Sequence, residues 1–167
     1  MRWLIALLIF TVSATVGHFV TLSRIPSFIM GQVHQALEAQ GVTEYVWVQS
    51  PRQTPQSQQI VRPSPDIAYA ICRFDTKDGP VRISAPTWEA YGTLSVFNAR
   101  TDNVVAQNLD QDPESKELII RRKPDPATPD AVIMSGVGIA LIRRLAPTQE
   151  SYDRAADLIN ESLCEKL

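Results

Sequence analysis

The polar residues that could carry out chemistry gather near the middle of the chain, between residues 66 and 103. Nine of them stand among short apolar runs and turn residues: Asp66, Tyr69, Asp75, Tyr91, Ser95, Asn98, Arg100, Asp102 and Asn103. Two carboxylates within about 10 Å of each other in a hollow could act as a general acid and a general base. Asp66 and Asp102 are the pair that would serve a periplasmic hydrolase or lyase in this way.

Turn chemistry offers a simpler explanation for the same residue types. Aspartate and asparagine side chains accept hydrogen bonds from backbone N–H groups in turns, a role open to Asp66, Asp75, Asp102 and Asn103. We favour this explanation, so we assign no catalytic residue and treat the nine as candidate binding residues. Catalysis stays as the alternative.

Histidine is absent from this central region. Both histidines, His18 and His34, precede it. The region therefore offers no Ser–His–Asp or Cys–His arrangement, and it lacks the usual ligand of protein metal sites. Gly136-Val137-Gly138 lies between apolar runs and opens no clear helix, so it does not predict a phosphate-binding loop. We expect no metal site and no cofactor.

The chain has two cysteines, Cys72 and Cys164, and no CxxC motif. Two thiols without a nearby histidine do not predict a zinc site. The residues alone leave a disulfide and two buried thiols equally open. In an oxidising compartment we expect the two to pair, joining the C-terminal helix to a sheet and adding about 2–5 kcal/mol of stability.

The charge of the chain argues against a nucleic-acid partner. The formal net charge is −2, and the densest basic run, Arg121-Arg122-Lys123, is followed at once by Asp125 and Asp130. Nucleic-acid-binding surfaces carry a clear excess of basic residues. The basic run is typical of a solvated strand end.

The N-terminus carries an uncharged apolar stretch. Residues 3–22, WLIALLIFTVSATVGHFVTL, would span about 30 Å as a helix, which is the thickness of the hydrocarbon core of a bilayer. Arg2 and the terminal amine precede the stretch and Arg24 follows it, a slight excess that favours a cytoplasmic N-terminus. We expect residues 1–24 to form a transmembrane anchor that contacts the lipid bilayer through residues 3–22.

A cleaved signal peptide is the alternative, with residues 4–12 as its apolar core and small residues near Ala14 as the cleavage point. Apolar residues continue to Leu22, however, where a signal peptide would have become polar. We therefore predict a single-pass protein of the bacterial inner membrane with its domain in the periplasm. Cleavage would instead release the domain into the periplasm.

Residues 25–41 predict a second, juxtamembrane helix. Ile25, Phe28, Ile29, Val33 and Leu37 recur at helical spacing. Pro26 suits the first turn of a helix and Gly41 suits its end. The apolar stripe would lie on lipid or on the domain, and a core helix of the domain is equally open.

Residues 42–167 predict a β domain. Strand-like runs occupy residues 43–49, 67–74, 81–85, 88–99, 104–107, 117–121, 131–134 and 137–145. Residues 75–79, DTKDG, look like the turn of a hairpin. Tyr152 to Cys164 has the apolar spacing of an amphipathic helix. This pattern predicts a mainly β fold, a β-sandwich of jelly-roll or immunoglobulin-like type with a C-terminal helix.

Four ordered motifs resemble a known family. They are VRPSPDIAYA (61–70), DGPVRISAP (78–86), YGTLSVFNARTDN (91–103) and GIALIRR (138–144). Together they are similar to the family catalogued as domain of unknown function 1254, and most of all to its small membrane-anchored members. The resemblance covers about half of the chain. Gly92 and Asn98 depart from the family pattern, which commonly has an aromatic residue and an aspartate at these two positions.

The resemblance implies a β-sandwich or jelly-roll-like fold and no established reaction. Larger relatives join this domain to a second one, catalogued as domain of unknown function 1214, so a separately encoded partner of that type is implied here. Our prediction for function is a membrane-anchored envelope protein whose periplasmic β domain binds a partner protein or a small ligand without catalysis.

Overall fold

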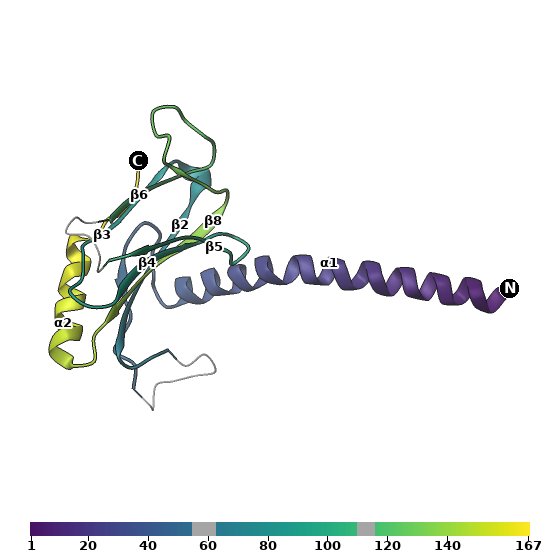
Figure 1. Ribbon diagram of the computed structural model, residues 1–167, viewed down its shortest axis with the longest axis horizontal. Coiled ribbons are helices and arrows are strands. Elements are labelled where there is room, and N and C mark those ends of the chain that lie inside the picture. The colour runs from purple at the N-terminus through teal and green to yellow at the C-terminus, as the bar shows by residue number, and fades with distance from the viewer. Residues whose placement is uncertain (55–62, 110–115) are drawn as a thin grey trace.

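A computed structural model describes residues 1–54, 63–109 and 116–167 of the chain. A long N-terminal helix projects from a body made of two β sheets and a short C-terminal helix (Figure 1). The mainly β character predicted from the alternating apolar residues is therefore confirmed.

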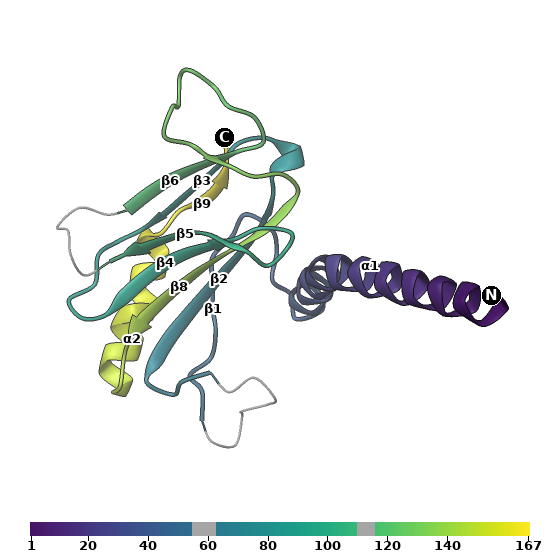
Figure 2. The same ribbon diagram turned by 45° about the vertical axis from the view of Figure 1, so that its right-hand side comes forward.

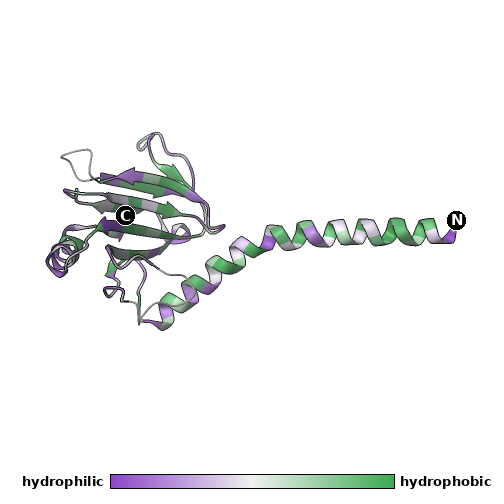
Figure 3. Cartoon of the chain, turned by 60° about the horizontal axis from the view of Figure 1, so that its bottom comes forward, coloured by the Kyte–Doolittle hydropathy of each residue, from purple (hydrophilic) through white to green (hydrophobic). Residues whose placement is uncertain are grey.

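Helix α1 runs from Arg2 to Ala39 without a break. We predicted an anchor over residues 1–24 and a juxtamembrane helix over residues 25–41, and the structure joins the two segments in one continuous helix. Pro26 lies inside the helix, where its ring removes one backbone hydrogen bond and pushes the preceding turn aside. Figure 3 shows the result, which is a bend part-way along the helix axis. The residues on both sides of the bend stay helical.

The larger sheet has five strands in the order β1 (Val48–Gln49), β2 (Ile67–Asp75), β8 (Val137–Leu145), β4 (Gly92–Phe97) and β5 (Asn103–Asn108), as Figure 2 shows. All neighbouring pairs are antiparallel. The strand predicted at residues 43–49 is reduced to a two-residue β1, since Tyr45 takes a positive φ of 62° that interrupts an extended run.

The second sheet has four strands in the order β7 (Val132–Ile133), β6 (Lys116–Arg121), β3 (Val81–Ala85) and β9 (Cys164–Lys166). Residues 75–79 do not form the predicted hairpin, because β2 and β3 belong to different sheets. A single 3-10 turn, η1 (Thr76–Asp78), carries the chain from one sheet to the other. The Asp75 side chain accepts a hydrogen bond from the Lys77 N–H and so starts this turn.

One core lies between the sheets. Alternate residues of β2, β8 and β4 join residues of β3 and β6 in a single buried cluster. Gly138 of β8 faces Phe74 of β2 in this core, and a Cβ atom at residue 138 would lie 2.5 Å from the Phe74 ring. Only glycine leaves room for the ring at that position.

The C-terminal helix is shorter than predicted. Helix α2 covers Gln149–Asp157, with Thr148 and Ser151 forming a capping box, and η2 (Leu158–Glu161) follows it. We predicted a helix through Cys164, but the chain turns there and pairs with β3 as strand β9. The apolar spacing misled the prediction because Ile159 still faces the core from a 3-10 turn.

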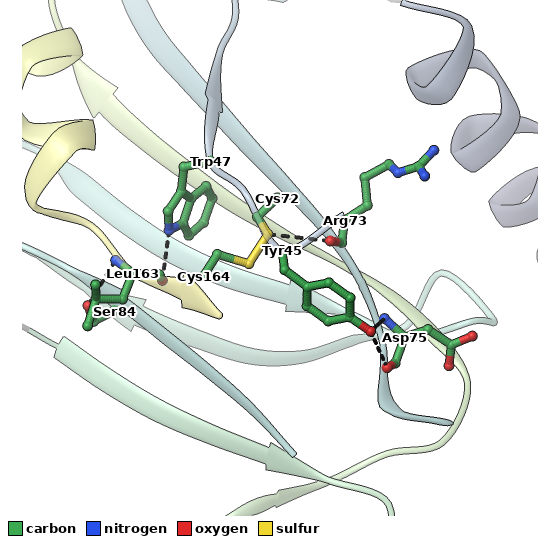
Figure 4. The surroundings of a disulfide bond; sticks show 8 residues. All are labelled: Tyr45, Trp47, Cys72, Arg73, Asp75, Ser84, Leu163 and Cys164. Atoms are coloured by element: carbon green, nitrogen blue, oxygen red, sulfur yellow. Dashed lines mark hydrogen bonds between the residues drawn. A yellow bond between two sulfur atoms is a disulfide. The ribbon is translucent and has the colours of Figure 1, made fainter. Parts of the chain in front are cut away.

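A disulfide joins Cys72 of β2 to Cys164 of β9, with 6.5 Å between their Cα atoms (Figure 4). The predicted pairing is present, but it links the two sheets rather than a helix and a sheet. Trp47 lies beside it and donates a hydrogen bond from Nε1 to the Leu163 carbonyl, at 2.8 Å. The C-terminal segment is therefore held by three interactions: the pairing of β9 with β3, the disulfide and the hydrogen bond from Trp47.

Candidate functional site

The C-terminal end of α1 is fixed to the five-stranded sheet by Arg73 of β2. The guanidinium donates a hydrogen bond to the His34 carbonyl at 2.8 Å and lies 3.6 Å from the Glu38 carboxylate and 3.7 Å from that of Glu44. Arg73 is only 6% exposed, and Met30 of α1 is also buried. The helix is therefore docked on the domain, on the side of the sheet that faces away from the core.

We call this side the outer face and define it by six residues of β2, β8 and β4. Strand register places Tyr69, Arg143 and Thr93 in one row and Ile71, Leu141 and Ser95 in the next. Side chains of a strand alternate between the two faces of a sheet, and the neighbours of these residues belong to the core. The six therefore point away from the core together.

Arg143 is the central charged residue of the outer face. Its Nε donates to Thr93 Oγ1 and its Nη2 to Ser95 Oγ, both at 3.1 Å. No carboxylate of the described residues forms an ion pair with it. The arrangement holds a half-buried guanidinium against the sheet without neutralising its charge.

Aromatic and apolar side chains surround this guanidinium. Tyr69 is half-buried, and its hydroxyl accepts a hydrogen bond from the Ser64 N–H at 3.0 Å. The next row, away from α1, holds the exposed Leu145 and Tyr91, which are 38% and 45% exposed. Such a surface can bind a complementary surface, but it holds no nucleophile with a base beside it.

Three of the nine predicted binding residues, Tyr69, Tyr91 and Ser95, therefore lie on or beside the outer face. The others lie in turns or at strand ends. Asn98 Oδ1 accepts hydrogen bonds from the backbone N–H groups of Arg100 and Asp102, in the turn between β4 and β5. Asn103 begins β5 after this turn. Of the four residues for which we favoured a role in turns, Asp75 accepts a hydrogen bond from a backbone N–H, whereas Asp102 accepts one from the Asn98 side-chain amide.

Asp66 and Asp102 stand at opposite ends of the sheet. Asp66 precedes Ile67, which pairs with Leu145, whereas Asp102 follows β4 beyond Phe97, which pairs with Ile139. The two rows are offset by six residues along β8, which is about 20 Å at 3.3 Å per residue. The two carboxylates cannot act on one substrate atom, so no acid–base pair forms here.

Sequence reasoning missed Arg143 as a site residue. Arg143 and Arg144 are adjacent in a strand, so their side chains must point to opposite faces, and one of them must enter the core. That signal was present in the GIALIRR motif. The sequence alone does not say which of the two points outward, because both rows of this strand contain apolar residues, and only the packing of the two sheets places Arg144 in the core.

The comparison with protein families settles the relationship. The model of a family described as protein of unknown function (DUF1254) matches residues 44–166. This chain belongs to the DUF1254 family. Within the described residues, the motifs that carry the resemblance include β2, β3, β4 and β8, which all contribute to the core of the DUF1254 domain, and β2, β4 and β8 also form its outer face.

Two solved structures resemble the DUF1254 chain. The VPA0106 protein from Vibrio parahaemolyticus shares 11% identity at a TM-score of 0.61, over 85% of this chain and 35% of that one. An uncharacterised protein from Burkholderia cenocepacia shares 15% identity at a TM-score of 0.45, over 77% and 37%. The chain thus spans about a third of the length of both proteins. No curated protein matches it.

Among the surface hollows of the DUF1254 domain are two of about 470 and 340 Å³. The first is lined by Arg121, Arg122 and Lys123, of which Arg121 is paired with Asp125. The second lies over Trp88 and Arg154. None of the nine predicted residues lines either hollow. Within the described part of the chain, no group of three or more His, Cys, Asp or Glu side chains is placed to hold a metal ion.

Proposed function

We propose that this DUF1254 chain is a membrane-anchored, non-catalytic binding domain of the bacterial envelope. Residues 3–22 of α1 would cross the inner membrane, and the β domain would stand in the periplasm and bind a partner protein. The observation that carries the proposal is helix α1, which is long and apolar enough to cross a membrane and wholly unburied over that stretch (Figure 3).

The uncleaved form of the anchor is supported by the residues beyond Ala14. Val16, Phe19, Val20 and Leu22 are all exposed large apolar side chains. Cleavage near Ala14 would leave these four in water at the start of the mature chain, where they would favour aggregation. A bilayer around them removes that exposed apolar surface.

A partner protein is supported by the form of the domain. We take the two sheets to form a β-sandwich of jelly-roll type, as the family resemblance implies. The chain matches about a third of the longer VPA0106 protein. We propose that a separately encoded β domain, of the type catalogued as domain of unknown function 1214, binds it. The outer face, with its arginine, tyrosines and apolar side chains, has the composition of a binding surface rather than of a catalytic centre.

Cell fractionation of the full-length chain tests the anchor. We expect the chain to stay in the membrane fraction after osmotic shock, with an intact mass that includes residues 1–24. A C-terminal alkaline phosphatase fusion should be active, because that enzyme is active only in the periplasm. A Leu8→Arg, Val16→Arg variant is the control, since two charges in the span should prevent insertion. A mature N-terminus near Thr15, or release of the whole chain by osmotic shock, would refute the anchor.

A further inference from the structure

We propose that the outer face is the surface on which the partner protein docks, and that a carboxylate of this partner contacts Arg143. The inference rests on the proposed function, because it takes the ligand of the domain to be a protein. It adds the location of the interface and the chemistry that the partner must supply.

The charge of Arg143 is the first argument. The guanidinium is half-buried and is held in place by Thr93 and Ser95, of which Ser95 is fully buried. Two arginines of neighbouring strands are paired with carboxylates, since Arg73 reaches Glu38 and Glu44 and Arg82 reaches Glu117 and Glu165. The buried Arg144 donates instead to two backbone carbonyls. Among the described residues, the hydrogen-bond partners of the Arg143 side chain are two hydroxyl groups, those of Thr93 and Ser95. A carboxylate from another protein would complete it with the bidentate geometry that guanidinium groups favour.

The surroundings of Arg143 are the second argument. Ile71 and Leu141 occupy the next row of the outer face, and Tyr91 and Leu145 stand exposed on the other side. An arginine among tyrosine and aliphatic side chains is the composition found at the centre of protein interfaces. Water is excluded from such a centre when a partner covers it, which strengthens a charge pair formed there.

A second copy of this chain does not fit the outer face. Two copies joined by their outer faces would bring one Arg143 towards the other, and like charges facing each other oppose association. A lipid surface does not fit either. Helix α1 docks at the Arg73 end of the face, and the exposed Tyr91 and Leu145 lie at the end away from it. A protein with an acidic residue among apolar ones is the occupant that matches both the charge and the position.

Photo-crosslinking in intact cells tests the inference with the full-length, membrane-bound chain. The probe is p-benzoylphenylalanine, placed at Tyr91 beside the outer face or at Ile119 of β6 as the matched control. Ile119 points outward from the other sheet, since its neighbours Leu118 and Ile120 are buried. We expect ultraviolet light to give one adduct of defined mass from residue 91 and none from residue 119.

Charge substitutions then test Arg143 itself. Arg143→Glu and Arg143→Gln should each lower the yield of the adduct roughly tenfold or more, because the carboxylate of the partner loses its cation. Arg143→Lys should keep part of the yield. Arg122→Glu, at the exposed residue that follows β6, should leave it unchanged. An intact disulfide in each variant, measured by non-reducing mass spectrometry, shows that the domain has folded.

The adduct also identifies the carboxylate. The partner peptide bound to residue 91 should contain an aspartate or glutamate whose replacement by lysine restores the adduct in the Arg143→Glu variant. Failure of this exchange overturns the role of Arg143, as does an Arg143→Glu yield equal to that of the native chain.

The outcomes separate the two proposals. An adduct from residue 119 alone overturns the outer face and leaves the partner-binding function standing. An adduct with lipid, or one of twice the mass of the chain, overturns the protein partner at this face. No adduct from either residue in a correctly anchored chain overturns both the interface and the partner.

Discussion

Arg143 and Arg144 are neighbours in β8 and meet opposite surroundings. Arg144 is 1% exposed, and it donates hydrogen bonds to the carbonyls of Pro86 at 3.0 Å and Ala155 at 3.4 Å. Its guanidinium lies 5.9 Å from the centre of the Trp88 ring. Burial lowers the pKa of Arg144 to about 10, and Glu161 raises it in part. A buried cation without an ion pair is costly, so its hydrogen bonds must hold α2 and the Pro86 loop in place.

The first prediction follows from these hydrogen bonds. Arg144→Lys should lower the free energy of unfolding by roughly 1–3 kcal/mol, because a single ammonium cannot reach both carbonyls and leaves one of them unpaired in the core. Urea denaturation of the purified chain in detergent measures the change. Arg143→Lys is the control and should cost less than about 1 kcal/mol, since residue 143 is half-exposed to water. Equal losses at the two residues would contradict this assignment.

At the scale of elements, the packing of β8 against β2 depends on the absence of a side chain at residue 138. The Phe74 ring and the end of the Met134 side chain occupy the space that a Cβ atom would take, at 2.5 and 2.8 Å. The Phe74 ring and the Met134 side chain both belong to the buried core between the two sheets. The strands can approach each other there only while residue 138 is glycine.

Gly138→Ala should therefore destabilise the domain by about 1–3 kcal/mol through overpacking. Thermal unfolding followed by circular dichroism measures the effect. Gly31→Ala serves as the control, because no atom lies within 4 Å of the added group and alanine favours the helix. Combining Gly138→Ala with Phe74→Leu should recover part of the loss. A neutral Gly138→Ala variant would show that the Phe74 ring can move aside.

The sequence predicted strands far better than it predicted how they connect. Apolar runs bounded by turn residues gave β3 and β8 with their observed bounds and β2 to within one residue. The turn at residues 75–79 was misread, since the same residue types serve a hairpin and a crossing between two sheets. Strand β9 was missed because three residues show no period, and its pairing with β3 is a long-range contact.

The candidate site could be predicted only in part for a similar reason. Tyr69 and Ser95 lie two strands apart, and only the register of β2, β8 and β4 brings them next to Arg143. The turn role of Asp75 was easier to predict, because its partner, the Lys77 N–H, lies two residues away. Chemistry that depends on local sequence was therefore recognised, and chemistry that depends on strand pairing was not.

At the scale of the whole molecule, the disulfide closes a loop of 92 residues between the two sheets. Removing the disulfide raises the conformational entropy of the unfolded chain and should lower the free energy of unfolding by about 2–5 kcal/mol. We expect the Cys72→Ala, Cys164→Ala variant to unfold at a lower temperature than the native chain. The native chain should show no thiol that reacts with an alkylating agent until it is reduced. Two reactive thiols in the native protein would contradict the link.

The stability of the contact between the C-terminal end of α1 and the domain should depend on pH. Burial lowers the pKa of His34, the cation of Arg73 lowers it further, and Glu44 and Asp75 raise it in part. The unfolded state then binds the proton more readily than the folded state, so stability is lost as the pH falls through the ordinary histidine value of about 6.5. The folded state therefore favours the neutral form of the His34 ring.

Comparing pH 7.5 with pH 5 tests this effect. The native chain should unfold at a lower urea concentration at pH 5, and His34→Gln should remove part of the difference. His18→Gln is the control, because residue 18 lies in the exposed part of α1 that we assign to the bilayer. An identical pH dependence in His34→Gln and the native chain would rule out His34 as the titrating group.

The unbroken course of α1 through Pro26 into its clamp at Arg73 limits how the domain can move. In the anchor that we propose, Met30 lies eight residues beyond Leu22, which corresponds to a stand-off of about 12 Å from the hydrocarbon layer. So short a helical connection would keep the domain at one height and one tilt while the chain diffuses in the membrane. A protein embedded in the same bilayer would meet it in two dimensions, at the same level on every encounter, and a weak contact could then suffice.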